Sequence, residues 1–286
     1  MKTSTEIGAL SGIVGEEKAI EYVARAGFDA WDFSLFELCR YNRREKCVIQ
    51  TNHPLSGKNY LSFARKLKQI GSDNGIVCNQ THAPFPSEAP EIRDVLKKAI
   101  ECTAEVGAQI CVIHPQLHFT PEENARMYMD YLPYAKSCGV KIATENLWVW
   151  DAENGRARYA ACSTPESFCR HLDAVGDENF VACLDIGHAE MLGEDVSAVS
   201  MIKALGKRLC ALHIHDNDKH RDSHQIPFSM DIDFVPIVDA LKGINYNGYF
   251  TLEAVDYFGG FTMDNVHVAT DNLAKAVKKL ADMFDL

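Results

Sequence analysis

The sequence has 286 residues, of which 47% are hydrophobic and 24% charged, as is typical of soluble globular proteins. Its formal net charge of −11 and its lack of a basic stripe argue against a nucleic-acid partner, because binding to phosphates depends on lysine and arginine side chains. No run of about 18 apolar residues exists, so we expect neither a membrane span nor a signal peptide. Ten cysteines without a CxxC pair fit free thiols in a reducing compartment, which predicts a cytoplasmic protein.

Short apolar runs alternate with longer amphipathic segments along the whole chain. The runs predict eight buried parallel strands, at residues 7–10, 30–33, 76–82, 109–114, 141–145, 180–185, 210–215 and 249–253. Helices are predicted between them, at residues 16–26, 60–70, 91–106, 120–139, 164–176, 234–241 and 267–283. Pro133 is expected to kink or split the helix over residues 120–139, because proline cannot donate a backbone hydrogen bond.

Eight strand–helix repeats without a break in composition predict one domain, a single (β/α)₈ TIM barrel over residues 1–286. An open doubly wound sheet is the alternative, but the turn at residues 8–12 is a poor match to a phosphate-binding glycine motif. The two long loops, residues 42–58 and 216–233, both follow strands. In a barrel they lie at the C-terminal face, where active sites are built.

Strands five to eight each end in a side chain that can bind a metal: Glu145, Asp185, His215 and Glu253. A single acidic residue at a strand end usually caps a helix, but four consecutive strand ends would converge on the barrel axis. Three carboxylates brought together repel one another unless a cation lies between them. We therefore predict one divalent metal ion, Mn²⁺ before Zn²⁺, Co²⁺ or Mg²⁺. His213 and His215 share one face of the alternating strand, and either can instead form hydrogen bonds within the core.

Two further histidines, His82 and His114, end strands three and four just before a proline-containing turn. We interpret both as substrate contacts, with a second metal or a capping role as the alternatives. Trp148 follows the fifth strand and is interpreted as a surface on which a sugar can stack, with core packing as the alternative.

Four short motifs give the chain a resemblance to a known family: Glu145-Asn146, Asp185-Ile186-Gly187-His188, His213-Ile214-His215-Asp216-Asn217 and Leu252-Glu253. In this order, they resemble the sugar phosphate isomerase/epimerase branch of the xylose-isomerase-like barrels. That branch includes ketose 3-epimerases and inositol-pathway barrels, with endonuclease IV as a more distant relative. The resemblance to ketose 3-epimerases implies that the four strand-end residues hold the metal, and that His188 and Arg221 bind substrate hydroxyls.

The resemblance implies a metal-dependent isomerase or epimerase of carbohydrate metabolism, acting on a ketose, keto-sugar or keto-inositol through an enediolate. Glu145 and Glu253 would be its general acid/base pair. A lyase or dehydratase acting on a keto-sugar or its glycoside is the alternative with the same metal site. The partner is then a small sugar, and a homo-oligomer is possible.

Endonuclease IV is the more distant alternative, a multi-zinc phosphodiesterase with nine ligands. All nine residue types have counterparts here, which include Asp222 and His224 in the loop after strand seven. These two residues are candidates for a second metal site or for ordering that loop. The net charge of −11 opposes this alternative, because acidic groups repel a DNA backbone.

Overall fold

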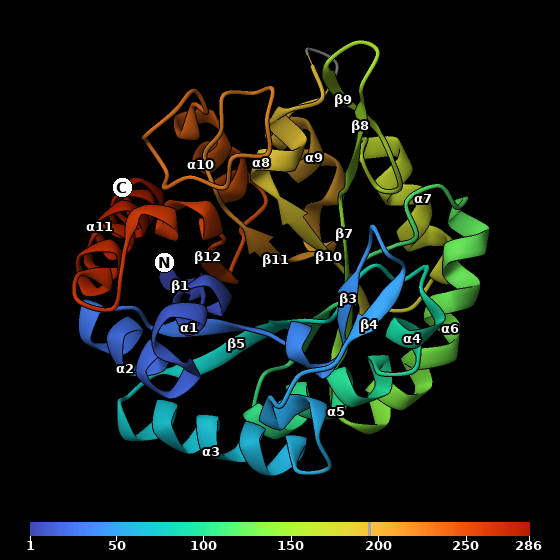
Figure 1. The fold of residues 1–286 in the computed structure, drawn as a ribbon. Coiled ribbons are helices and arrows are strands. Elements are labelled where there is room, and N and C mark those ends of the chain that lie inside the picture. The colour runs from blue at the N-terminus through green and yellow to red at the C-terminus, as the bar shows by residue number, and fades with distance from the viewer. Residues whose placement is uncertain (194–195) are drawn as a thin grey trace.

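The structure is a computed structural model that describes residues 1–193 and 196–286. Its main sheet has eight parallel strands, in the order β11-β10-β7-β6-β5-β2-β1-β12. They are β1 (Lys2–Glu6), β2 (Ala30–Ser34), β5 (Val77–His82), β6 (Ile110–Val112), β7 (Lys141–Glu145), β10 (Phe180–Asp185), β11 (Leu209–His213) and β12 (Tyr249–Leu252). A bridge between Ile214 and Leu252 joins the two edge strands. The sheet closes there, which confirms the predicted (β/α)₈ barrel (Figure 1).

Helices surround the barrel, and the longer ones run along its outer face (Figure 1). They are α1 (Gly8–Val14), α2 (Glu16–Ala26), α3 (Tyr60–Asp73), α4 (Pro90–Arg93), α5 (Leu96–Val106), α6 (Pro121–Ser137), α7 (Pro165–Val175), α8 (Ile186–Glu190), α9 (Ala198–Leu205), α10 (Phe234–Gly243) and α11 (Val266–Asp285). The predicted start at Thr120 is a capping box, in which the threonine hydroxyl accepts from Glu123 and the Glu123 carboxylate accepts from Thr120. No helix in the two described ranges is long and apolar enough to cross a membrane.

The first predicted strand, residues 7–10, is wrong. Residues Lys2–Glu6 form the strand, and Gly8–Val14 form a helix. The strand contains no purely apolar side chain, but Ser4 is buried and donates a hydrogen bond to Asn79 Oδ1 at 2.6 Å. Because the buried side chains of this strand are polar and pair with polar groups of other strands, residues 2–6 contain no hydrophobic run. Ile7 and Leu10, which suggested a strand, instead pack in the core around the barrel.

Three other predicted boundaries also differ. The seventh strand ends at His213 rather than at residue 215, and the helix expected over residues 91–106 is divided into α4 and α5. Helix α6 continues through Pro133, so the predicted split does not occur. Two hairpins that were not predicted extend from the C-terminal face: β3–β4 (Arg40–Asn42 and Cys47–Ile49) and β8–β9 (Trp148–Asp151 and Arg156–Tyr159).

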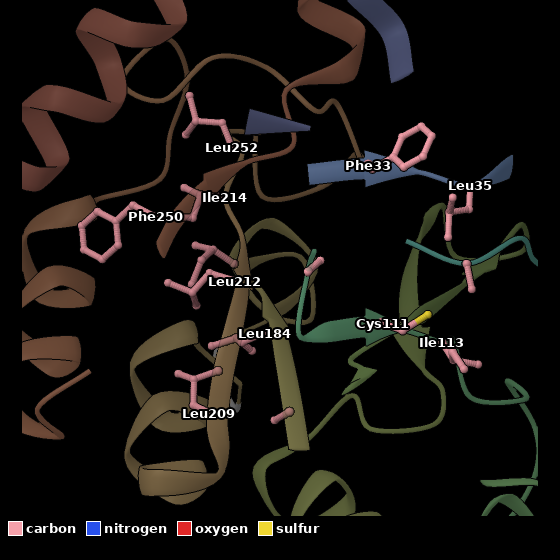
Figure 2. Packing of buried hydrophobic residues seen from close by; sticks show 14 of the residues in the cluster. Phe33, Leu35, Cys111, Ile113, Leu184, Leu209, Leu212, Ile214, Phe250 and Leu252 are labelled. Carbon is pink, nitrogen blue, oxygen red and sulfur yellow. The ribbon is translucent and has the colours of Figure 1, made fainter. Parts of the chain in front are cut away.

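Alternate residues of each strand face the helices or the barrel interior. Leu184, Leu212, Phe250 and Leu252 are fully buried between strands and helices and belong to the main core (Figure 2). A smaller apolar cluster contains Val112, Ala143, Val181, Cys183 and Ala211. Within β7, β10 and β11 these small residues share a strand face with the strand-end residues Glu145, Asp185 and His213. The small side chains therefore fill the barrel below a polar layer at the C-terminal ends.

Short 3₁₀ segments lie in the connections between strands and helices. They are η1 (Phe36–Leu38), η2 (Pro54–Ser56), η3 (Gly206–Arg208) and η4 (Val255–Gly260). Of these, η1 follows β2 and η4 follows β12, so both lie next to strand ends that reach the polar layer. Phe36 of η1 packs edge-on against His82, with ring centroids 5.1 Å apart.

Candidate active site

A cavity of about 520 Å³ opens at the C-terminal ends of the strands. Its polar lining includes Glu6, His82, His114, Glu145, His188, Asp222, His224 and Glu253. Its apolar lining includes Phe36, Phe85, Leu147, Trp148 and Trp150. A concave site with convergent ionisable groups at this face of a barrel is the expected position of an active site.

Four donor atoms, one each from Glu145, Asp185, His213 and Glu253, lie within 4.8 Å of one another. All four residues are buried. Three of them were predicted as metal ligands from their strand ends. The structure places His213 rather than His215 in this group, because β11 ends at His213 and His215 lies beyond it. Both histidines face the same side of the chain, so only their height in the barrel distinguishes them.

The His213 ring is held from both of its nitrogens. Nδ1 lies 2.9 Å from Glu145 Oε1, and Nε2 lies 3.2 Å from Asp32 Oδ2. Asp32 also accepts a hydrogen bond from Gln80 Nε2 at 2.9 Å. A carboxylate that accepts from one ring nitrogen of a histidine directs the other nitrogen to a metal. Nδ1 is therefore the atom of His213 that faces the carboxylates.

Electrostatics in this group favour a cation. Burial opposes ionisation of Glu145, but the nearby His213 and the hydrogen bonds from His114 and His213 hold the pKa of Glu145 well below its usual value. Burial likewise opposes the charge of His213, yet the surrounding carboxylates raise its pKa well above the usual value. A buried imidazolium thus supplies the positive charge that three carboxylates require, and a divalent ion satisfies the same requirement. Asp185 Oδ2 is buried and has no hydrogen-bond partner among the described residues, which also fits a metal ligand.

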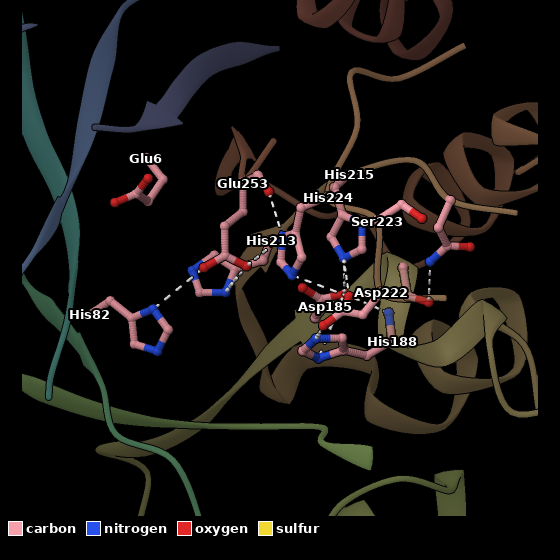
Figure 3. A network of polar contacts seen from close by, with 12 residues as sticks. Glu6, His82, Asp185, His188, His213, His215, Asp222, Ser223, His224 and Glu253 are labelled. Carbon is pink, nitrogen blue, oxygen red and sulfur yellow. Dashed lines mark hydrogen bonds and ion pairs between the residues drawn. The ribbon is translucent and has the colours of Figure 1, made fainter. Parts of the chain in front are cut away.

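A second group of donors contains His188, His215, Asp222 and His224 (Figure 3). The rings of His215 and His224 stack with their centroids 3.9 Å apart. A Cβ atom at Gly187 would overlap the His215 ring, so the absence of a side chain there creates the space for His215. His215 Nε2 and Asp222 Oδ1 are both buried and lie at ion-pair distance from Asp185 and His224, but neither makes a well-aligned hydrogen bond with a described residue.

Asp222 connects this second group to the wall of the cavity. Its carboxylate lies 3.3 Å from His188 Nε2 and 3.2 Å from His224 Nε2, and it accepts a hydrogen bond from Trp148 Nε1 at 3.3 Å. Despite burial, the nearby carboxylates raise the pKa of His224 to about 10. Four residues predicted from the sequence therefore lie together at the wall of the cavity: His188, Trp148, Asp222 and His224. Asp185 lies between the two donor groups, because its Oδ1 is 3.2 Å from His215 Nε2.

A third group contains His82, His114 and Glu145, which is shared with the first group. His82 Nε2 lies 2.8 Å from His114 Nε2, which in turn lies 3.2 Å from Glu145 Oε2. Phe85 stacks on His114 with ring centroids 4.9 Å apart. The two histidines that were predicted to contact substrate thus lie at the cavity, and they also lie where a second metal ion could share Glu145.

Arg221 does not join the cavity. It is exposed, and its backbone N–H donates to Asp218 Oδ1 at 2.7 Å. Its prediction relied on the spacing from His215, and the structure gives no contact between this side chain and the donor groups. Glu6 and Asp32 were not predicted from the sequence to lie at the site, and His213 was named there only as a neighbour of His215 on the same strand face. An acid at the end of β1 would have pointed to Glu6 only if the polar run at residues 2–6 had been read as a strand.

Residues 20–285 match the family model described as the xylose isomerase-like TIM barrel. The chain belongs to this family. An uncharacterized protein of Methanocaldococcus jannaschii is 26% identical over 255 residues, which cover 82% of this chain and 78% of that protein. The D-psicose 3-epimerase of Ruminiclostridium cellulolyticum is 24% identical over 284 residues, which cover 92% of this chain and 86% of that protein.

Solved structures of similar xylose isomerase-like barrels share the fold. A D-tagatose 3-epimerase-like protein aligns with a TM-score of 0.72 and 19% identity, covering 100% of this chain and 98% of that one. An L-ribulose 3-epimerase aligns with a TM-score of 0.70 and 16% identity, covering 100% of this chain and 95% of that one. At these identities the comparison establishes the barrel fold, and the chemistry must be argued from the site.

Proposed function

We propose that this protein is a divalent-metal-dependent sugar isomerase or epimerase that acts on a ketose, keto-sugar or keto-inositol. The main support is the group formed by Glu145, Asp185, His213 and Glu253 beside a cavity large enough for a sugar. The similar D-psicose 3-epimerase and L-ribulose 3-epimerase are sugar epimerases, which favours the same class of reaction.

The metal would be held by Glu145, Asp185, His213 and Glu253. Three carboxylates and one imidazole suit Mn²⁺, and also Zn²⁺, Co²⁺ or Mg²⁺. Bound there, the ion stabilises the negative charge that develops on the substrate oxygens when a proton leaves the carbon next to the carbonyl. Asp32 would orient His213 in this group through its hydrogen bond to Nε2.

Glu145 and Glu253 would move the proton. They belong to different strand ends, and both are buried beside the cavity. Burial opposes their ionisation, but His213 and the other neighbouring histidines hold the pKa of each well below its usual value, so both are ionised and able to accept a proton. Epimerisation requires proton exchange on both faces of a planar intermediate, which two bases from different strand ends could provide.

His82, His114, His188 and Trp148 would contact the sugar. Each lines the cavity, and their ring N–H groups and indole face suit the hydroxyls and the apolar face of a sugar. Arg221 is not included because it lies outside the cavity lining. Solvent-deuterium exchange tests this function: the protein loaded with Mn²⁺ should place deuterium on a carbon of at least one ketose in a panel. If no member of the panel exchanges a carbon-bound proton, the isomerase and epimerase assignments both fail.

A multi-zinc phosphodiesterase resembling endonuclease IV is the second candidate. It is supported by the second and third donor groups, which offer positions for further ions next to the first. The net charge of −11 disfavours a DNA substrate. Metal content separates the two candidates: one ion per chain fits the epimerase, whereas three zinc ions with hydrolysis of bis(4-nitrophenyl) phosphate fit the phosphodiesterase.

A further inference from the structure

Glu6 is a carboxyl of the cavity for which the two-base scheme has no use. It is the last residue of β1, it lines the cavity, and only 4% of its surface is exposed. In Figure 3 it lies on the side of Glu253 and His82, away from Asp185 and the second donor group. It belongs to none of the donor groups formed by the described residues.

The position of the Glu6 side chain is fixed through one oxygen only. Oε1 accepts a hydrogen bond from the backbone N–H of Gly8 at 2.5 Å, and another from the hydroxyl of Ser34. A Cβ atom at Gly8 would come into conflict with both Oε1 and the Ser34 side chain, so the turn after β1 needs glycine to hold the carboxyl in place. Two donors, the backbone N–H of Gly8 and the hydroxyl of Ser34, therefore hold one oxygen at a fixed point.

The other oxygen, Oε2, has no partner. It is buried and makes no hydrogen bond with any described residue. An unpaired buried oxygen costs free energy, so a protein normally pairs it unless a ligand or water does so. A carboxyl with a purely structural role would be expected to use both oxygens within the protein. Here one oxygen is anchored and the other is buried and unpaired, in a side chain that lines the cavity.

Its surroundings favour the neutral form of the carboxyl. Burial, together with the nearby acids Asp32 and Glu253, raises the pKa of Glu6 to about 8, and the N–H of Gly8 and the charge of His213 offset only part of this. With Oε1 accepting two hydrogen bonds, the proton belongs on Oε2, where it becomes a donor without an acceptor.

We propose that Glu6 is a substrate-contacting acid whose Oε2–H donates a hydrogen bond to an oxygen of the bound sugar. The identity of the ligand as a sugar rests on the proposed function, whereas the position of the donor does not. An oxygen of a hydroxyl or carbonyl group pairs the unused donor and completes the hydrogen bonding of Glu6. The contact comes from β1, near the N-terminus, whereas the proposed metal ligands come from the second half of the sequence. It adds a third carboxyl with a role different from those of Glu145 and Glu253.

Binding and turnover by Glu6 variants test this contact. In the Mn²⁺-loaded protein with D-fructose as the probe, Glu6→Gln keeps a neutral donor of the same shape and should bind within about threefold of the wild type. Glu6→Ala removes the donor and should weaken binding about tenfold, the effect of one neutral hydrogen bond. Any loss of kcat should be smaller than the loss of affinity. Melting temperatures of both variants establish that they fold. Equal affinity of the wild type and Glu6→Ala would overturn the proposal, as would equal losses in both variants.

Infrared spectroscopy separates this proposal from the proposed function. The Mn²⁺-loaded wild type should show a carbonyl band of a protonated carboxyl that moves on addition of the unreactive polyol xylitol, and Glu6→Gln should lack this band. A moving band with no deuterium exchange into any ketose would retain the Glu6 contact and reject the epimerase. Deuterium exchange without such a band would retain the epimerase and reject the Glu6 contact. If neither D-fructose nor xylitol binds the wild type and no ketose of the panel exchanges a carbon-bound proton, both proposals fail.

Discussion

Nε2 of His213 lies 3.2 Å from Oδ2 of Asp32, deep in the barrel and with both side chains fully buried. The pair joins the end of β11 to β2 on the far side of the barrel, and the hydrogen bond decides which ring nitrogen turns toward the carboxylates. Asp32 thus has the place of a positioning residue for the proposed metal group, and it belongs to none of the donor groups formed by the described residues.

Replacement of Asp32 should therefore weaken metal binding. Asp32→Ala removes the acceptor that orients His213, and partners of this kind typically contribute about 10- to 100-fold in affinity. Competition against a fluorescent chelator measures Mn²⁺ affinity directly. Asp151→Asn, in the β8–β9 hairpin, is the control and should bind Mn²⁺ like the wild type. Unchanged affinity in Asp32→Ala would remove Asp32 from the metal site.

The two neighbouring histidines should respond differently to substitution. His213→Ala removes a donor from the group with Glu145, Asp185 and Glu253, and should abolish tight binding of the first ion. His215→Ala should leave that ion bound, because His215 belongs to the second group. Metal content after dialysis, measured for both variants in parallel, decides between them. The opposite pattern would restore His215 as the ligand predicted from the sequence.

A side chain at Gly187 should destabilise the protein. A Cβ atom there would overlap the buried His215 ring, and overpacking of this kind typically costs about 1–3 kcal/mol. Urea unfolding of Gly187→Ala measures the cost. Gly12→Ala is the matched control, since nothing lies within 4 Å of its Cβ position and it lies in a helix. The control should be as stable as the wild type or more so, and equal stability of both variants would contradict the close contact at Gly187.

Glu145→Gln and Glu253→Gln should each abolish epimerisation, measured as formation of the epimer, although the base that remains can still exchange the proton on its own face. An amide cannot take up the proton, and two bases are needed to exchange it on both faces. Because each residue is also a proposed metal ligand, Mn²⁺ content must be measured on the same samples and epimerisation assayed with saturating Mn²⁺. A variant that still converts the ketose to its epimer would show that its residue is not one of the two bases.

The pH dependence of stability should reveal Glu6 in the metal-free protein. The unfolded carboxyl loses its proton near its usual pKa of 4.5, while the folded one, whose pKa burial raises to about 8, keeps it. The folded state thus binds more protons between these values, so Glu6 lowers stability as pH rises from 4.5 to 8.

Glu6→Gln removes this effect and cannot ionise. It should match the wild type at pH 5 and exceed its stability at pH 9 by on the order of a few kcal/mol. Urea unfolding in the presence of a chelator gives both values. Asp32, Glu253 and His213 lie close to Glu6 and titrate in both proteins, so the comparison uses the difference between the two at each pH. A difference that does not grow with pH would show that Glu6 is ionised in the folded protein.

Much of the barrel could be predicted from the sequence, because the patterns that report it are local. Seven of the eight predicted strands overlap observed ones, and the helices predicted from Thr120 and Thr164 begin there, each with the threonine as its N-cap. The first strand was missed since its buried side chains are polar and form hydrogen bonds across the barrel, as Ser4 does with Asn79. The pattern of hydrophobic residues cannot predict a strand whose buried side chains are polar and bond to residues elsewhere in the sequence.

The order of Glu145, Asp185 and Glu253 along the chain was enough to place three carboxylates in one group, because consecutive parallel strands of a barrel end at the same face. Only the tertiary structure decided which histidine joins them. His213 and His215 share a strand face, and their heights differ by one pleat, which depends on where β11 ends and how it pairs with its neighbours. The positions of Asp32 and Glu6 were likewise decided by contacts between distant segments, and such contacts leave no local pattern in a sequence.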